Sequence, residues 1–469
     1  MKRGKLSAIL SVLLAFSALA SASDDPNQKL DRQFQSAVAQ FNAGKYAEAA
    51  TQLESLLPYA PKSFEIHELL GLAYAAQSQD SKALEHFQVA VQLKPDSPEA
   101  HTNLAASLSH LGRTEQAGEQ FRKALALEPH DYDANHNLGE FYVQAGKLAE
   151  AAPYLEEAQR IQPAAYDNGY DLAMAWFLTG RYEQAHQLVQ TLLRQKDTAE
   201  LHSLLGQIEE KQEQYMDAVT ELQTAAHMDP SEDNLFHWGS ELLLHRTYEP
   251  AIDIFQKGTE LYPKSPRLFI GLGMALYSRG KYDEAVKALL AAADLDPSDP
   301  RCYYFLSKAY DSSPTHADEV IQRFRRFTEL QPGNGRACYY YAMSLWKGRR
   351  AEEPDIDMRQ VESLLEKSVS LDPKLAEAHL QLGNLYSDRH DYVKAGPEYE
   401  RALELNSDLA DAHYRLGQVY VHTGQKDRAQ QEFDIYQRLR AQHLAELDKE
   451  RAEVQQFVYT AKAAPAAKP

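Results

Sequence analysis

The chain has 469 residues, a formal net charge of −19 at pH 7 and only two cysteines. Nucleic acid is therefore excluded as an expected partner, because phosphate binding requires a basic footprint that so acidic a chain lacks. Two cysteines also exclude a disulfide scaffold, so packing has to stabilise the fold.

Residues 1–22 have the pattern of a secretory signal peptide. Lys2, Arg3 and Lys5 precede a short apolar stretch that ends in small residues. This stretch is shorter than a membrane span requires, and small residues offer two cleavage sites. We expect export to the periplasm or beyond, with no stable membrane insertion after cleavage. An uncleaved signal anchor is the alternative, and residues 23–29 are interpreted as a short linker.

Between residues 30 and 443 the sequence repeats itself about every 34 residues. Alanine or glycine recurs at fixed places within each repeat, and a proline closes most of them. The prolines are Pro61, Pro95, Pro129, Pro163, Pro230, Pro263, Pro297, Pro332 and Pro373. A period of this length predicts an array of stacked helical repeats.

One repeat, "HELLGLAYAAQSQDSKALEHFQVAVQLKP" (residues 67–95), resembles the tetratricopeptide repeat family. The matching residues are Leu70, Gly71, Tyr74, Ala83, Phe87, Ala90 and Pro95. The resemblance implies an all-α fold, a right-handed α-solenoid superhelix of about twelve helix-turn-helix repeats with a C-terminal capping helix. Histidine often stands at the family's tryptophan position, as at His67, His101, His202, His379 and His413. We expect these histidines to pack inside their repeats.

Two departures from the repeat pattern lie near the C-terminus. The tenth repeat contains a long loop between its helices, at residues 347–360. Residues 444–460 are predicted to extend the capping helix. Residues 461–469 are predicted to be a disordered tail, because their composition cannot build a core.

Motifs of enzymes and metal sites are absent from the sequence. The stretch "HELLG" at residues 67–71 begins like a zinc protease motif, but Gly71 stands where the second histidine is required. The chain also lacks a glycine-rich phosphate loop and a C-x-x-C pair. We therefore predict a non-enzymatic protein with no catalytic residues, cofactor or metal.

The candidate binding surface is a stripe of residues along the first helix of each repeat. Its members stand at positions 2, 5, 9 and 12, counted from the residue after the turn that follows the preceding proline. In the family this stripe lines the concave groove, and here it becomes apolar from the fifth repeat onwards, the sixth repeat excepted. Aromatic residues and methionine favour an adaptable binding surface. The candidates are Tyr170, Met174, Phe177, Phe236, Arg267, Ile270, Met274, Tyr277, Arg301, Tyr304, Lys308, Arg336, Tyr339, Met343 and Trp346. Alternatively, the terminal cap or neighbouring first helices cover this face.

Position 2 is acidic in most repeats but holds Arg267, Arg301 and Arg336 in three successive ones. Arginine there opposes the helix dipole. These arginines either pair with nearby acids such as Asp296 and Asp299 or bind the carboxylates of a partner.

These features predict a scaffold that binds protein or peptide partners, acidic and aromatic in character, outside the cytoplasm. The alternative is a glycan-binding or accessory subunit of a carbohydrate-processing or glycosyltransferase system. Its basis is that residues 100–129 resemble the repeats of protein O-linked N-acetylglucosamine transferases. The sequence leaves the oligomeric state open.

Cys302 and Cys338 occupy near-equivalent places on neighbouring first helices. Such places lie about 10 Å apart, beyond the reach of about 7 Å for an unstrained disulfide. We predict two free, buried thiols.

Overall fold

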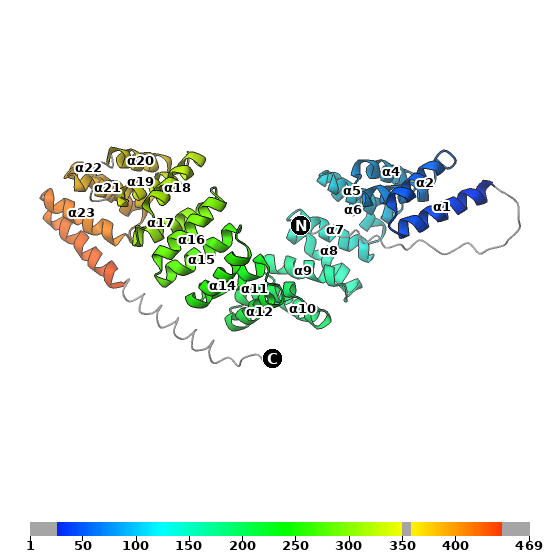
Figure 1. Ribbon diagram of the computed structural model, residues 1–469, viewed down its shortest axis with the longest axis horizontal. Helices are drawn as coiled ribbons and strands as arrows, with labels where there is room; N and C mark the ends of the chain where they lie inside the picture. Colours follow the sequence, from blue (N-terminus) through cyan, green and yellow to red (C-terminus); the bar gives the residue numbers. More distant parts are fainter. Residues whose placement is uncertain (1–25, 349–357, 443–469) are drawn as a thin grey trace. The chain divides into compact units, whose positions relative to one another are not determined.

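The computed structural model describes residues 26–348 and 358–442, and every regular element in these ranges is an α-helix. Figure 1 labels the helices up to α23, and a further helical segment runs from residue 426 to 442. The helices are α1 (Pro26–Asn42), α2 (Tyr46–Leu56), α3 (Phe64–Ala76), α4 (Asp80–Leu93), α5 (Pro98–His110), α6 (Thr114–Leu127), α7 (Tyr132–Gln144), α8 (Leu148–Ile161), α9 (Tyr166–Leu178), α10 (Tyr182–Gln195), α11 (Ala199–Lys211), α12 (Tyr215–Met228), α13 (Glu232–Leu244), α14 (Tyr248–Leu261), α15 (Pro266–Arg279), α16 (Tyr282–Leu295), α17 (Pro300–Ser312), α18 (Ala317–Leu330), α19 (Gly335–Lys347), α20 (Met358–Leu371), α21 (Ala376–Asp388), α22 (Tyr392–Leu405) and α23 (Ala410–His422).

The helices follow one another as helix-turn-helix pairs, and the last pair joins α23 to residues 426–442. The first helix of a pair packs against its own second helix and also contacts the first helix of the next pair. Such contacts join α3 to α5 and α5 to α7, and likewise α13 to α15, α15 to α17 and α17 to α19. First helices therefore stack side by side, and the predicted all-α solenoid of repeats is confirmed.

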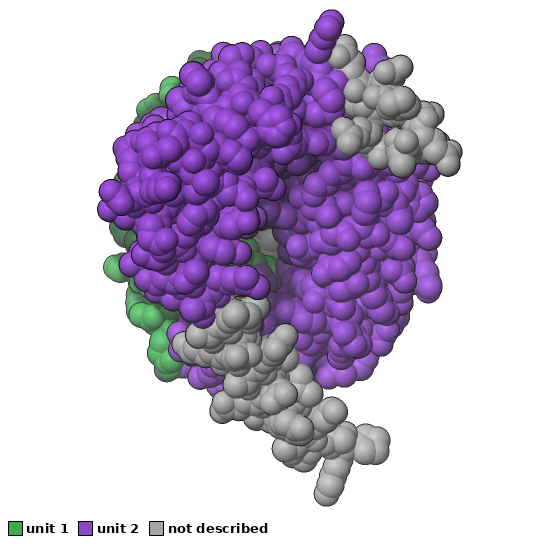
Figure 2. Space-filling view, turned by 90° about the vertical axis from the view of Figure 1, so that its left-hand side faces the viewer, with its two compact units in different colours: residues 1–185 green, residues 186–469 purple. Residues whose placement is uncertain are grey.

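The chain divides into two compact units, residues 1–185 and residues 186–469, coloured green and purple in Figure 2. In unit 1, one apolar core runs from Ala37 to Phe141. Unit 2 has two apolar cores, from Leu242 to Tyr340 and from Ala342 to Ala429. In the view of Figure 2 the purple surface of unit 2 is hollowed between two parts of the same unit.

Small residues on the first helix bring the two helices of a repeat together. A Cβ atom added to Gly71 would lie 2.4 Å from the ring of Phe87, and one added to Gly139 would lie 2.5 Å from Leu155. The same glycine and large residue, 16 positions apart, recur as Gly383 with Tyr399. A larger residue at these glycines would force the backbones apart, so the small residues set the helix spacing.

Polar residues cap most of the described first helices, and left-handed residues turn the chain between the helices of most repeats. The side chain of Ser265 accepts a hydrogen bond from the backbone N–H of Leu268 and so caps α15. After α15, Gly280 takes a left-handed conformation with φ 85°. After α13, Arg246 does so with φ 60°, and this turn places His245 at the end of α13.

Several predicted segments lie outside the described residues. They are the signal peptide (1–22), residues 23–25 of the linker (23–29), most of the loop at 347–360, the extension at 444–460 and the tail at 461–469. The remaining residues of the linker, 26–29, belong to the first turn of α1. Within residues 26–348 and 358–442, no helix combines the length and apolar character needed to cross a membrane.

Candidate functional site

The predicted groove residues of unit 2 lie on four successive first helices, α13, α15, α17 and α19. Phe236, Arg267, Met274, Tyr277, Tyr339 and Trp346 are half-buried. Arg301, Tyr304, Lys308 and Arg336 are exposed. The exposed residues all belong to α17 and α19, so the accessible part of the predicted surface is concentrated on the ninth and tenth repeats.

Ile270 and Met343 were predicted to face an open groove, and this part of the prediction is wrong. Only 6% of Ile270 and 9% of Met343 is exposed. First helices of neighbouring repeats contact one another, which leaves little room for solvent between them. The alternative interpretation, that neighbouring helices cover the stripe, therefore holds for these two residues.

Tyr170, Met174 and Phe177 lie on α9 in unit 1. All three are half-buried, and the ring of Phe177 lies 6.1 Å from that of Tyr182. These three residues form a local apolar surface of unit 1, whereas the other candidates belong to unit 2.

A pocket of about 240 Å³ opens between α17, α18 and α19. We call it the arginine pocket. Its lining consists of Pro300, Arg301, Tyr304, Phe305, Phe327, Asn334, Arg336 and Tyr340. Half of these eight residues are aromatic. The two arginines come from equivalent positions of the ninth and tenth repeats. The repeat period thus brings Arg301, Tyr304 and Arg336 to one pocket, although Arg301 and Arg336 lie 35 residues apart in the sequence.

The two arginines of this pocket differ in their partners. Arg301 pairs with Asp299, its Nη2 lying 2.6 Å from Oδ2, and this contact holds the pKa of the Asp299 carboxyl below its usual value. Arg336 is exposed and forms no ion pair within the described part of the chain. Burial raises the pKa of the Tyr340 hydroxyl, and the nearby Arg336 opposes this rise. Arg336 therefore keeps its charge available at the surface.

Arg267, the third arginine, is committed to contacts inside unit 2. Its Nε lies 2.7 Å from Glu232 Oε1, and its Nη2 pairs with Asp233. Its guanidinium also lies 5.2 Å from the centre of the Phe236 ring. Both acids begin α13, one repeat earlier, so Arg267 ties α15 to α13. Of the two interpretations of these arginines, internal pairing holds for Arg267 and Arg301. Arg336 has no such acid among the described residues.

Of the two tyrosines predicted near the pocket, Tyr304 lines it and Tyr339 does not. Tyr304 is 41% exposed, and its ring meets Phe305 edge-on at 5.0 Å. Lys308 lies 5.8 Å from the centre of the same ring. Tyr340 lines the pocket, whereas Tyr339 beside it does not. Burial raises the pKa of Tyr339.

The sequence pattern did not identify Tyr340 and Phe305 as pocket residues. Both follow predicted groove residues directly, and Tyr340 belongs to the run Tyr339–Tyr341. Three consecutive tyrosines cover most of a helical turn, so periodicity alone cannot say which ring faces the pocket. Only the position of α18, whose Phe327 forms one wall, resolves the choice.

The residues of the arginine pocket are suited to binding the side chains of a ligand. Apolar rings can bury an aromatic or aliphatic side chain, and the Arg336 guanidinium, which has no ion pair among the described residues, can bind a carboxylate. The thiols nearby are unsuited to reaction, since Cys302 and Cys338 are free but buried, as predicted. Burial raises the pKa of the Cys302 thiol to about 12, which removes the reactive thiolate at neutral pH.

Comparison with known families identifies the repeats. Models described as tetratricopeptide repeat match residues 34–98, 102–166, 142–208 and 410–442. A model described as TPR repeat matches residues 273–311 and 388–424. Taken together, these matches cover more than half of the chain.

Two curated relatives match parts of the chain. The human protein O-mannosyl-transferase TMTC1 is 26% identical over 154 residues, which are 33% of this chain and 17% of that protein. The TPR repeat-containing protein YpiA of Bacillus subtilis is 27% identical over 145 residues, 31% of this chain and 32% of that protein. The chain thus matches less than a third of the length of either relative.

Among solved structures, pilF of Pseudomonas aeruginosa matches with a TM-score of 0.40 and 20% identity. The match covers 44% of this chain and 96% of that one.

Proposed function

Since this chain belongs to the tetratricopeptide repeat family, we propose that it is a non-enzymatic scaffold that binds protein partners through the first helices of unit 2. Repeats of this kind present extended surfaces suited to protein–protein interaction. We place the contact at the arginine pocket, because exposed aromatic and cationic side chains meet there. The signal-peptide pattern of residues 1–22 supports a partner outside the cytoplasm.

The arginine pocket carries this proposal. Its walls are largely apolar, and Arg336 at its rim has no ion pair within the described residues. A chain with a net charge of −19 would repel acidic ligands at most of its surface. Arg336 supplies a positive charge at the pocket, and the exposed Lys308 on α17 lies 5.8 Å from the centre of the Tyr304 ring. We therefore propose that the bound segment is a peptide in which a carboxylate lies next to an aromatic or large aliphatic side chain.

The spacing of the first helices supports an extended peptide. Neighbouring helices stack about 10 Å apart, a distance spanned by about three residues of extended chain. A peptide lying across α17 and α19 would place one residue in the pocket and another, about three positions away, on the rim. Met274 and Tyr277 on α15, both half-buried, would continue the surface in one direction.

Selection from a random peptide library displayed on phage tests the proposal. The purified chain should enrich peptides that combine Asp or Glu with Phe, Tyr, Trp or Leu at short spacing. Arg336→Glu should weaken binding of the enriched peptides by roughly tenfold or more, since a charge-assisted hydrogen bond contributes about 1.5–3 kcal/mol. Binding is measured by fluorescence anisotropy with the synthetic peptides.

The matched control is Arg325→Glu. Arg325 lies on α18 of the preceding repeat, is exposed, and pairs with Glu329 at 3.1 Å. It makes the same change in charge without touching the pocket, so it should leave peptide affinity within about twofold. The proposal fails if the library yields no enriched sequence, or if both variants weaken binding equally.

The glycan alternative is favoured by the similarity to a protein O-mannosyl-transferase, which covers 33% of this chain. That match covers only 17% of the transferase, so a shared repeat array is sufficient to account for it. Incubation of the purified chain on a glycan array, in parallel with the peptide selection, separates the two functions. Saturable sugar binding that Tyr304→Ala abolishes would favour the glycan function over the peptide function.

A further inference from the structure

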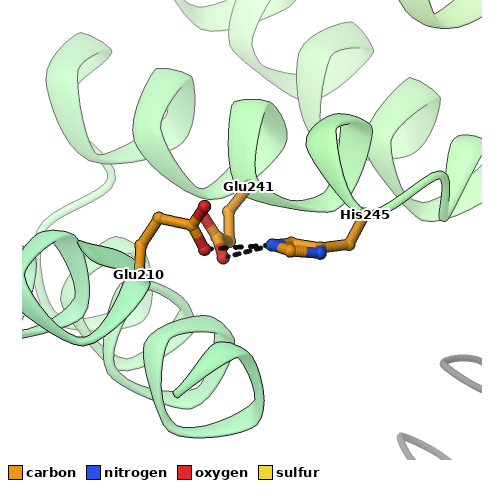
Figure 3. Close-up of side chains that lie close together, drawn as sticks. All are labelled: Glu210, Glu241 and His245. Carbon is orange, nitrogen blue, oxygen red and sulfur yellow. Dashed lines mark hydrogen bonds and ion pairs between the residues drawn. The ribbon is translucent and has the colours of Figure 1, made fainter. Parts of the chain in front are cut away.

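Three potential metal ligands converge at the contact between the sixth and seventh repeats. Glu210 lies near the end of α11, Glu241 lies in the last turns of α13, and His245 follows α13 directly. Figure 3 shows the two carboxylates and the imidazole pointing toward a common point from the two helices. One ligand atom from each residue lies within 4.8 Å of the others. This cluster is separate from the arginine pocket.

Both carboxylates approach the same ring nitrogen. His245 Nε2 lies 3.0 Å from Glu210 Oε2 and 3.3 Å from Glu241 Oε1. His202 provides a contrast in the same unit, because its Nε2 meets Asp197 and its Nδ1 meets Glu221. In His202, each ring nitrogen therefore forms a hydrogen bond with a different carboxylate. At His245 both carboxylates approach one nitrogen, so the three ligand atoms lie close enough together to surround a single ion.

This cluster differs from ordinary groups of surface charges because Glu241 is buried. Glu241 is only 5% exposed, and its Oε1 accepts no hydrogen bond. Two carboxyl groups are thus held together in a site with little water, where a bound cation would compensate their charge.

The ring of His245 is also held in place. The Tyr215 ring lies against it, with 4.3 Å between the ring centres. Glu210 and His245 keep side-chain exposures of 18% and 15%, which leaves the cluster a route to solvent. The site is therefore ordered on its inner side and accessible on its outer side.

We propose that Glu210, Glu241 and His245 bind a divalent transition-metal ion of the Zn²⁺ class. Imidazole nitrogen and carboxylate oxygen bind Zn²⁺ at about 2.0–2.2 Å in tetrahedral sites. Tetrahedral ligands at that length are about 3.4 Å apart. The two separations between His245 Nε2 and the carboxylate oxygens, 3.0 and 3.3 Å, are close to this value. Ca²⁺ and Mg²⁺ fit less well, because they require more oxygen ligands and avoid imidazole.

Such an ion would join two repeats, since Glu210 belongs to α11 and the other two ligands to α13. The stability of a repeat array depends on the contacts between neighbouring repeats. An ion bound to the folded chain and not to the unfolded chain would stabilise this contact. The inference goes beyond peptide binding and does not depend on it.

Isothermal titration of the purified full chain with ZnCl₂, after removal of metal with EDTA, tests the site. We expect one high-affinity Zn²⁺ per chain and no comparable binding of CaCl₂ or MgCl₂. Glu210→Gln, Glu241→Gln and His245→Gln should each weaken Zn²⁺ binding by roughly a hundredfold, because losing even an outer partner of a metal ligand costs 10–100-fold. Zn²⁺ should also raise the unfolding temperature of the natural chain but not of these variants.

His202→Gln is the matched control, because it removes a histidine flanked by two carboxylates that do not share one nitrogen. It should leave Zn²⁺ affinity unchanged. Glu210→Gln is the least buried of the three changes, and circular dichroism confirms that each variant is folded. Absence of Zn²⁺ binding by the natural chain would overturn the proposal. So would an equal loss of affinity in His202→Gln and His245→Gln.

Discussion

The substitution Gly271→Ala should destabilise unit 2, although alanine is the better helix former. Gly271 lies in α15 against the ring of Phe255, a residue with 0% exposure. A Cβ atom at position 271 would lie 2.4 Å from that ring. Favourable carbon–carbon contacts are about 3.5–4.0 Å long. The ring would therefore have to move by more than about 1 Å inside a close-packed core.

The neighbours of Phe255 limit that movement. A Cβ atom at Gly239, on α13, would also lie 2.9 Å from the Phe255 ring, and the Phe236 ring centre is 6.2 Å away. Overpacking of a core costs about 1–3 kcal/mol, and we expect the upper half of this range here. Alanine recovers about 1 kcal/mol through helix propensity. The net loss in the free energy of unfolding should be about 1–2 kcal/mol.

Native-state hydrogen exchange of the amides in α14 and α15 measures this loss locally, since a repeat array does not unfold as one two-state unit. Gly396→Ala in α22 is the control. Its added Cβ would lie 3.7 Å from Val419 Cγ1, an ordinary contact, so it should stabilise its own repeat by about 0.5–1 kcal/mol. Slower exchange in both variants would refute the argument from close approach.

Two further outcomes follow from buried titratable groups in unit 2. Burial raises the pKa of the Glu209 carboxyl from 4.5 to about 8, so folded chains keep a proton that unfolded chains lose. The free energy of unfolding should therefore fall as the pH rises from 4.5 to about 8. Glu209→Gln should reduce this fall in urea titrations at several pH values, whereas unchanged pH dependence would exclude Glu209 as its source. Cys302 and Cys338 are 0% and 1% exposed, so maleimide should label neither thiol in the folded chain at neutral pH and both thiols in urea. Mass spectrometry measures the labelling. Rapid labelling of the folded chain would contradict the burial of the two thiols.

The fold could be predicted from the sequence because each repeat contains the residues that determine how its two helices pack. Glycine and a large residue 16 positions later, as at Gly71 and Phe87, identify the two helix faces that meet. The period of about 34 residues then fixes how the units stack. Both features are local, and each recurs often enough in the chain to be read without a structure.

Contacts between repeats were harder to predict. Arg267 pairs with Glu232, and His245 lies beside Glu210, each pair 35 residues apart in the sequence. Neither pair forms a short motif, because the partners meet only when neighbouring first helices stack. A search for acids and bases one repeat length apart would have found both pairs. It would not have established the burial of Glu241, which depends on the packing of α11, α12 and α13.

The residue at position 4 of the first helix makes a structural contact with the preceding repeat boundary. This contact limits which residues can replace Tyr303 in the ninth repeat. His101 Nε2 lies 3.0 Å from the carbonyl oxygen of the proline six residues earlier. Asn135 Nδ2 donates to the equivalent proline carbonyl at 2.9 Å, and the Tyr303 hydroxyl does so at 3.1 Å. Three different side chains therefore satisfy the same backbone group at a repeat boundary. Tyr303 is committed to this structural contact and is fully buried. Tyr304, the next residue, is 41% exposed and lines the arginine pocket, so partner specificity can change at Tyr304 without loss of the boundary contact.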